Sequence, residues 1–285
     1  MLTFKDIKIE NMLSCPICNS PMTVSHDGSG CLSCNGAKKH SYDFASGGYV
    51  NMSLPGQSGG GDSKQAVKAR SDFLNLDHYK PISDTLCKIL HNNILNLTDP
   101  VVIDAGCGEG YYTNAIAESG FSVAGFDISK FAADAGAKRA KRAGNSNAFF
   151  GVASVFDLPI NNECADAVVN VFAPCAEDEY SRVLKKDGFL IVVCAGPDHL
   201  LGLMRAVYEN IHQNDKRADM PQKLNKIASE RLKYDIRVNG NENIKNLFAM
   251  TPYYWKTSQN DVQKLDKLES LETEIDIIFE IYQKS

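Results

Sequence analysis

Four cysteines near the start of the chain have the spacing of metal ligands. Cys15 and Cys18 form one Cys-x-x-Cys pair, Cys31 and Cys34 form a second pair after twelve intervening residues, and His40 follows. Thiolate is a preferred ligand of zinc, and thiols in a reducing compartment stay reduced instead of forming disulfides. A closed tetrahedral site needs only four ligands, so one of the five residues is surplus. Spacing alone favours the four cysteines and predicts a structural zinc site.

A second group of residues has the composition of a ligand-binding turn. The stretch VVIDAGCGEGYYT (101–113) predicts a buried strand ending at Asp104, then a glycine turn and a helix that begins near Tyr111. The turn holds Gly106, Gly108 and Gly110. Glycines let the backbone approach a ligand closely, and at Gly106 we expect a side chain to collide with that ligand. The GxGxG spacing differs from the dinucleotide pattern GxGxxG and resembles the first motif of class I S-adenosylmethionine methyltransferases. An ordinary glycine-rich turn is the alternative.

Two acidic residues extend this predicted nucleoside site. Asp127 ends the next apolar run, SVAGFDI, where a carboxylate can accept both ribose hydroxyls. Its alternative role is that of an N-cap for the following helix. Asp157, in VASVFDLP (152–159), is the candidate acid beside the adenine, and its alternative role is to cap a turn.

The pattern after residue 81 predicts the elements that hold these residues. Helical stretches alternate with five strand-length apolar runs: VVIDAG, SVAGFDI, AFFGVA, DAVVNVFA and FLIVVCAG. Such runs are typical of a parallel sheet covered on both faces. The predicted fold class is therefore α/β, a Rossmann-like, doubly wound sheet of the class I methyltransferase type, with a small N-terminal zinc-binding domain. The acid-rich segment 261–285 is expected to be a helix and a strand facing solvent.

Composition divides the chain into three parts. Residues 1–55 form the predicted zinc-binding module, 56–80 a flexible connector and linker helix, and 81–285 the methyltransferase domain. PGQSGGGDS (55–63) has the composition of a mobile linker, and a helix is expected over Lys64–Leu76, capped by Asp62 or Ser63. A module of about 50 residues has little core of its own, so zinc should stabilise it and the two domains should have separate cores.

Charge and hydropathy narrow the classes of function. The net charge is −5, but residues 1–80 carry eight basic and seven acidic side chains, a net of +1, so the acidic excess lies in the remainder. No apolar run approaches the roughly 20 residues that span a bilayer, which argues against a membrane protein. The N-terminus lacks the pattern of a signal peptide, so we expect a cytoplasmic protein. The sequence leaves the oligomeric state open, a homodimer included.

Motifs outside the generic fold resemble one family along nearly the whole chain. They are CPIC (15–18), KKHSYDFASGGYVNM (38–52), GDSKQAVKARSDFLNLDHYKP (61–81), GCGEGYYT (106–113), VFAPC (171–175), GPDHL (196–200) and MTPYYW (250–255). The chain resembles the RlmA-type 23S ribosomal RNA (guanine-N1)-methyltransferases. In that family the second half of the zinc site is a cysteine followed three residues later by a histidine. His40 fits the histidine, whereas Cys34 lies two residues too far upstream. The resemblance implies the ligands Cys15, Cys18, Cys34 and His40.

The same resemblance implies methyl transfer from S-adenosylmethionine to N1 of a guanine in a hairpin of 23S ribosomal RNA. The implied substrate pocket lies after the fourth and fifth strands and contains Asn170, Phe172, Pro174 and Asp198. A core position is the alternative for Phe172. The resemblance implies cofactor contacts for Tyr79 and His199. We expect RNA contacts, or else only a solvated face, at Lys38, Lys39, Lys64, Lys68 and Arg70. Two other functions stay open: a small-molecule methyltransferase with a zinc-ordered lid, and an inactive RNA-binding protein.

Overall fold

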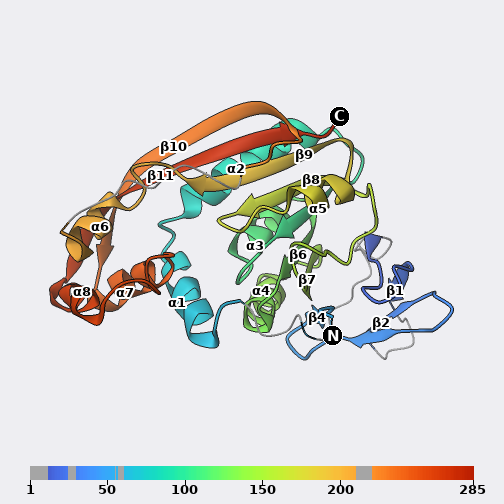
Figure 1. Ribbon diagram of the computed structural model, residues 1–285, viewed down its shortest axis with the longest axis horizontal. Coiled ribbons are helices and arrows are strands. Elements are labelled where there is room, and N and C mark those ends of the chain that lie inside the picture. Colours follow the sequence, from blue (N-terminus) through green and yellow to red (C-terminus); the bar gives the residue numbers. More distant parts are fainter. Residues whose placement is uncertain (1–11, 25–29, 55, 57–60, 210–219) are drawn as a thin grey trace.

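A computed structural model describes residues 12–24, 30–54, 56, 61–209 and 220–285 (Figure 1). An eight-stranded sheet organises most of this chain, in the order β10-β11-β9-β8-β5-β6-β7-β4. The six strands from β9 to β4 run parallel, and β11 and β10 are added antiparallel. The strands are β4 (Val50–Asn51), β5 (Val101–Ala105), β6 (Ser122–Asp127), β7 (Ala148–Val152), β8 (Ala165–Val171), β9 (Leu184–Ala195), β10 (Asn225–Asn239) and β11 (Ser270–Gln283). All five predicted parallel strands are confirmed.

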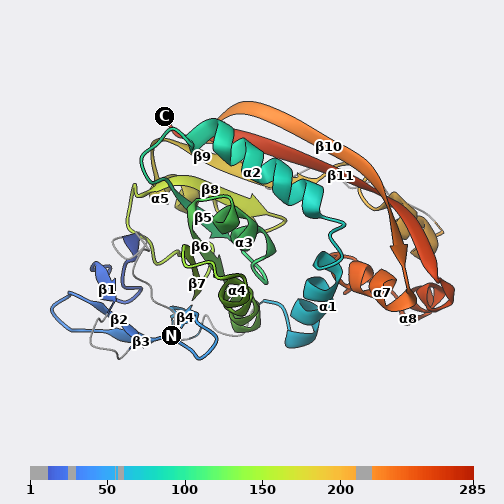
Figure 2. The same cartoon turned by 180° about the vertical axis from the view of Figure 1, so that it is seen from behind.

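Helices cover both faces of the sheet, as expected for a doubly wound fold. The helices α2 (Lys80–Ile94), α3 (Tyr111–Glu118) and α4 (Lys130–Ala143) contribute to one buried apolar cluster. The helix α5 (Glu177–Val183) and part of the N-terminal segment contribute to a second cluster. Figure 2 shows α2 lying along the sheet. None of the helices in the described ranges is both long and apolar enough to cross a membrane.

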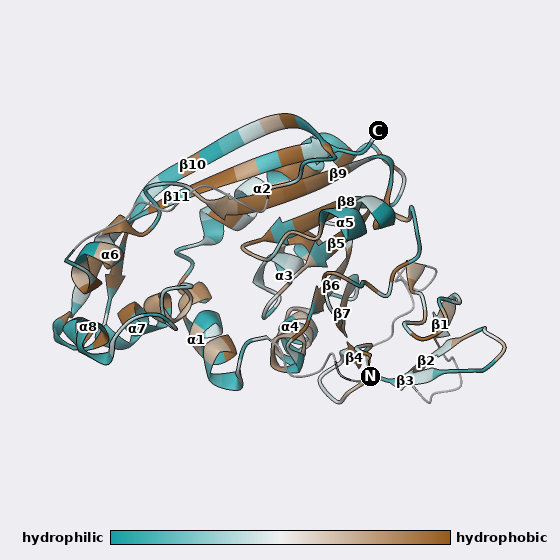
Figure 3. Ribbon diagram, viewed as in Figure 1, coloured by the Kyte–Doolittle hydropathy of each residue, from teal (hydrophilic) through white to brown (hydrophobic). Residues whose placement is uncertain are grey.

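The C-terminal strand corrects one expectation. We predicted that the segment 261–285 faces solvent, but β11 is largely buried between β9 and β10. Its buried acids are compensated by bases on the outer strand: Asp276 pairs with Arg231, and Glu280 pairs with Lys226. Figure 3 shows the contrast between the largely hydrophilic β10 and the hydrophobic β8 and β9. The high acid content of the segment therefore reflects ion pairing within the sheet instead of solvent exposure.

The N-terminal part shares a core with the large sheet. The strands β1 (Met22–Val24), β2 (Cys31–Cys34) and β3 (Ser41–Asp43) form a small antiparallel sheet, and β4 pairs with β7 at the edge of the large one. Leu32 and Met52 lie in the same buried cluster as Phe149 and Ile160. The expectation of separate cores is therefore wrong, because the module and the large sheet bury apolar side chains against each other. The division of the chain near residue 55 stays a prediction.

The predicted linker helix is α1 (Lys64–Leu74), two residues shorter than expected. Ser63 is its N-cap, and its Oγ accepts a hydrogen bond from the Ala66 N–H at 3.2 Å. Residues 55 and 57–60 of the predicted connector lie outside the described residues. α1 contacts both α4 and α7 (Asn241–Ala249) (Figure 1, Figure 2). The remaining helices are α6 (Leu201–Val207), α8 (Gln259–Val262) and the 3-10 helix Gln263–Lys267.

Candidate functional site

The glycine turn after β5 has the left-handed backbone that its residues permit. The φ angles are 82° at Gly106, 55° at Gly108 and 73° at Gly110. A Cβ on Gly106 would lie 2.5 Å from the Cβ of Ala173. A Cβ on Gly110 would lie 2.7 Å from the Cα of Gly136. A Cβ on Gly108 would come no closer than 3.6 Å, to Arg70. Packing within the protein already requires Gly106 and Gly110. The collision that we expected between a side chain at Gly106 and a ligand is therefore already a collision with Ala173, whereas a Cβ on Gly108 would make only an ordinary van der Waals contact with Arg70.

Two carboxylates hold this turn. Asp104 is buried, its Oδ2 accepts a hydrogen bond from Thr113 Oγ1 at 2.6 Å, and burial raises its pKa to about 7. Asp127 ends β6 as predicted, and its oxygens accept from the Gly108 N–H at 3.0 Å and the Ser129 N–H at 2.7 Å. Burial raises the pKa of Asp127. The N-cap of α4 is Ser129, so the capping alternative for Asp127 is wrong. Asp127 thus links the glycine turn to the start of α4.

Arg70 of α1 fastens the linker helix to the glycine turn. Its guanidinium pairs with Glu109, inside the turn, and with Asp62, and three quarters of its side chain is buried. A guanidinium with two carboxylate partners has little capacity left for a phosphate. The expectation of an RNA contact at Arg70 is therefore replaced by a structural role. Lys68 is also paired, with Asp72, but its side chain is 72% exposed. Lys38, Lys39 and Lys64 are exposed.

Three aromatic side chains meet at the carboxyl edge of the sheet. Tyr79 is buried, and its hydroxyl lies 3.3 Å from Nε2 of His199. The Asp276 N–H donates to Nδ1 of His199 at 3.3 Å. Burial lowers the pKa of His199 to about 4, so the ring is neutral near pH 7. Because Nδ1 accepts a hydrogen bond, Nε2 carries the proton and donates to Tyr79. The Phe172 ring stacks on His199, with centroids 6.2 Å apart and planes at 17°.

The other predicted pocket residues have different environments. Phe172 is 46% exposed with φ at 55°, so the alternative of a core position is wrong. Asn170 is buried, and its Nδ2 donates to the Pro174 carbonyl at 2.9 Å and the Tyr180 hydroxyl at 2.8 Å. Asn170 therefore shapes the loop that presents Phe172 and the exposed Pro174. Asp198 accepts from Lys233 Nζ at 2.7 Å.

Sequence reasoning missed the residue that positions Asp198 and His199. The buried Asp276 carboxylate accepts from Arg231 Nε at 2.7 Å and Nη2 at 2.8 Å, and from the Asp198 N–H at 2.9 Å. A Cβ on Gly196 would lie 2.4 Å from this carboxylate. An acid within the apolar run EIDIIFE (274–280) was the available signal, because a buried acid needs a partner.

Asp157 lies in the loop between β7 and β8. It is exposed in a short turn whose backbone is closed by the Asp157 N–H and the Ser154 carbonyl at 3.1 Å. This geometry agrees with a turn-forming residue. A role beside the adenine stays a prediction.

The zinc cluster has the geometry of a closed site. Ligand atoms of Cys15, Cys18, Cys34 and His40 all lie within 4.8 Å of one another. Cys15 Sγ and Cys34 Sγ each lie 3.5 Å from His40 Nδ1, and Cys18 Sγ lies 3.7 Å from Cys34 Sγ. Zinc bonds of about 2.3 Å to sulfur and about 2.0 Å to nitrogen make tetrahedral edges of about 3.8 Å between two sulfurs and about 3.5 Å between sulfur and nitrogen. The four residues therefore fit zinc without rearrangement.

Neighbouring groups support this ligand set. Cys34 Sγ accepts the His40 N–H at 3.2 Å, and the Tyr42 hydroxyl lies 3.4 Å from Cys15 Sγ. Such donors stabilise thiolates, and hydrogen bonding around Cys18 lowers its pKa to about 7. Cys31 lies at the other end of β2, with Sγ 3.8 Å from Ser33 Oγ. The four-cysteine alternative is wrong, because Cys31 is not part of this cluster.

Comparison with known proteins identifies the class of this fold. A family model described as a methyltransferase domain matches residues 98–265, more than half of the chain. This range contains the glycine turn, Asp127, Phe172 and His199, whereas Tyr79 lies before it. The chain is a class I S-adenosylmethionine-dependent methyltransferase.

Curated relatives identify the family more closely. A putative 23S rRNA (guanine-N(1)-)-methyltransferase of Micromonospora griseorubida is 31% identical over 67% of this chain and 68% of its own length. One of Bacillus subtilis is 27% identical over 94% of this chain and 95% of its own. The 23S rRNA (guanine(748)-N(1))-methyltransferase of Streptomyces fradiae is 28% identical over 88% of this chain and 89% of its own. The chain belongs to the family of 23S rRNA (guanine-N1)-methyltransferases.

Proposed function

We propose that the protein transfers a methyl group from S-adenosylmethionine to N1 of a guanine in a hairpin of 23S ribosomal RNA. The observation that carries the proposal is similarity to the curated methyltransferases along nearly the whole chain, zinc-ligand region included. Similarity limited to residues 98–265 would support only some form of methyl transfer. A small-molecule enzyme or an inactive RNA-binding protein is not favoured, because the named relatives are rRNA methyltransferases.

The residues at the carboxyl edge of the sheet are suited to hold the cofactor. The Asp127 carboxylate is in position to accept from a ribose, and the turn with Gly106, Gly108 and Gly110 has no side chains that would keep a ligand from its backbone. We assign Asp157 to the adenine side, and Tyr79, Tyr111 and His199 to the remaining cofactor contacts. The sulfonium of the bound cofactor supplies the electrophilic methyl group. The protein must then align guanine N1 with that methyl group and exclude water.

The substrate base is assigned to the loop after β8. Phe172 is an exposed ring on a left-handed residue, an arrangement that favours stacking with an extruded base. Asn170 holds that loop through the Pro174 carbonyl, and Pro174 itself is exposed. Asp198 offers a carboxylate near the same edge for a polar contact with the base. These roles place the methyl acceptor over β8 and β9.

The zinc region and α1 are assigned to the RNA backbone. Lys38 and Lys39 lie beside the zinc ligands, and Lys64 and Lys68 lie on α1, all with exposed side chains. Zinc would hold the first pair in place without entering the reaction, since its four ligands leave no open position. We further propose a cytoplasmic enzyme, because its substrate is ribosomal RNA. A homodimer is the assembly to be tested, by sedimentation with and without RNA.

The decisive experiment supplies the protein with cofactor and three substrates. They are a transcript of the 23S rRNA hairpin, the same hairpin with adenosine at the target position, and free guanosine. We expect N1-methylguanine, detected by mass spectrometry, only in the guanine-containing hairpin. Methylation of free guanosine at a comparable rate would favour the small-molecule function. Cofactor binding without product from any substrate would overturn methyl transfer to this RNA.

A further inference from the structure

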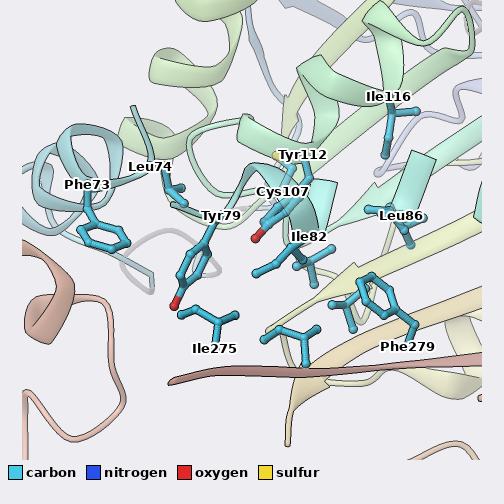
Figure 4. Close-up of a cluster of buried hydrophobic side chains, with 14 of the residues drawn as sticks. Phe73, Leu74, Tyr79, Ile82, Leu86, Cys107, Tyr112, Ile116, Ile275 and Phe279 are labelled. Carbon is cyan, nitrogen blue, oxygen red and sulfur yellow. The ribbon is translucent and has the colours of Figure 1, made fainter. Parts of the chain in front are cut away.

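Tyr112, in the first turn of α3, carries a buried hydroxyl without a partner. The residue is 9% exposed, and within the described ranges no donor or acceptor lies within hydrogen-bonding reach of its hydroxyl oxygen. Figure 4 shows the hydroxyl directed toward the side of Tyr79, in the buried cluster that contains both residues. Buried hydroxyls in folded proteins are almost always paired, so an orphan of this kind calls for an explanation.

The missing partner is an acceptor. Burial raises the pKa of Tyr112 well above that of a free tyrosine, so the hydroxyl keeps its proton and can donate. The N–H groups at the start of α3 are further donors. No capping side chain accepts from them, because the N-cap is Gly110, and the first turn contains no acid. A helix N-terminus favours a negatively charged group. The two features together describe a small site for an anion.

The strand order indicates which part of a bound cofactor would reach this site. The strands run β8-β5-β6-β7, and Asp127 at the end of β6 is the acceptor for the ribose. With the nucleoside over β6 and β7, the amino-acid end must lie toward β5 and β8. Tyr112 follows the turn after β5, and its neighbour Tyr79 contacts His199, in the loop after β9. The orphan hydroxyl is therefore on the amino-acid side.

We propose that the Tyr112 hydroxyl donates a hydrogen bond to the α-carboxylate of the cofactor's methionyl group. The proposal deepens the cofactor assignment made under the proposed function and names one more residue that binds this ligand. It involves proton sharing only, with no bond formed or broken. The carboxylate would also face the N–H groups at the start of α3.

The test compares two ligands that differ only at this end. S-adenosylhomocysteine carries the amino-acid group, whereas methylthioadenosine has the same nucleoside and thioether without it. In calorimetric titrations with Tyr112→Phe we expect about tenfold weaker binding of S-adenosylhomocysteine and an affinity for methylthioadenosine within twofold of wild type. The ligand-free variant should melt at the wild-type temperature or above, because the substitution removes an unpaired polar atom.

Tyr208→Phe is the matched control. It removes a hydroxyl that is already bonded to Thr257, so it should leave both ligand affinities unchanged. Unchanged binding of S-adenosylhomocysteine to Tyr112→Phe would overturn the proposal. Equal weakening of both ligands would also overturn it, since the hydroxyl would then act on the pocket as a whole. No RNA is present, so failure of the rRNA assignment leaves this result unaffected.

Discussion

The zinc cluster and the cofactor edge are organised in opposite ways. At the zinc cluster the four ligand atoms already have tetrahedral spacing, and their neighbours donate to the sulfurs. At the cofactor edge the buried hydroxyl of Tyr112 has no hydrogen-bond partner within the described residues. Zinc stays bound, and the protein alone already holds its ligands at the right spacing. The cofactor exchanges, and it supplies a hydrogen-bond partner that the protein alone lacks. Substitutions at the two places should therefore differ in what they disturb.

The largest effect is expected from Cys15→Ser. Loss of one thiolate should release zinc, and the shared core around Leu32 and Met52 should transmit the damage to the large sheet. We expect the melting temperature to fall by about 10 °C or more, since about 1 kcal/mol corresponds to about 2–4 °C at this size. Metal analysis and calorimetry measure both effects. Cys31→Ser is the control and should keep its zinc. Full zinc occupancy in Cys15→Ser would mean that the ligand set is wrong.

The second effect is confined to the cofactor edge. Asp127→Ala removes the acceptor from the Gly108 and Ser129 N–H groups and the proposed ribose acceptor. We expect binding of S-adenosylhomocysteine to weaken by at least about tenfold while zinc stays bound. Binding of S-adenosylhomocysteine to Asp157→Ala distinguishes the two roles of this exposed residue. Weaker binding would indicate the role beside the adenine, and unchanged binding would indicate a turn-forming role. Affinity of Asp127→Ala within twofold of wild type would remove the central assignment of the site.

A third effect is a dependence of stability on pH that originates at Asp104. Its pKa is raised from 3.8 to about 7 by burial, so the folded state holds a proton that the unfolded state releases. This contribution to stability is complete below about pH 4 and is lost as the pH rises to about 7. Asp104→Asn should flatten the change in melting temperature between pH 5 and 8. An unchanged profile in that variant would assign the pH dependence to other groups.

The smallest effect is expected at the exposed lysines. Replacing Lys38, Lys39, Lys64 and Lys68 with glutamine should weaken binding of the rRNA hairpin and reduce its salt dependence, without changing cofactor affinity. Replacing four other exposed lysines, Lys88, Lys141, Lys186 and Lys267, makes the same change in charge and provides a matched control. Equal losses in the two variants would indicate a response to net charge alone.

Much of the fold was predictable because it is local in sequence. The apolar runs predicted all five parallel strands, and Ser63 marked the start of α1. The zinc ligands needed the family resemblance, since spacing alone favoured Cys31 over His40. Long-range pairing was not predictable. The partners of Arg70 lie 8 and 39 positions away, and the contact between Asp276 and His199 spans 77 positions. Burial of β11 was missed because its acids suggested solvent, while their compensating bases lie on another strand.

The position of β11 also bears on how the protein is made. The last strand of the chain lies between β9 and β10, so the order of synthesis differs from the order in the sheet. β10 leaves the ribosome before the strand that joins it to the sheet exists. The Asp276 carboxylate and the turn that it holds are likewise assembled only after β11 has been made. A nascent chain therefore carries its zinc ligands long before it carries the strand that completes its cofactor edge.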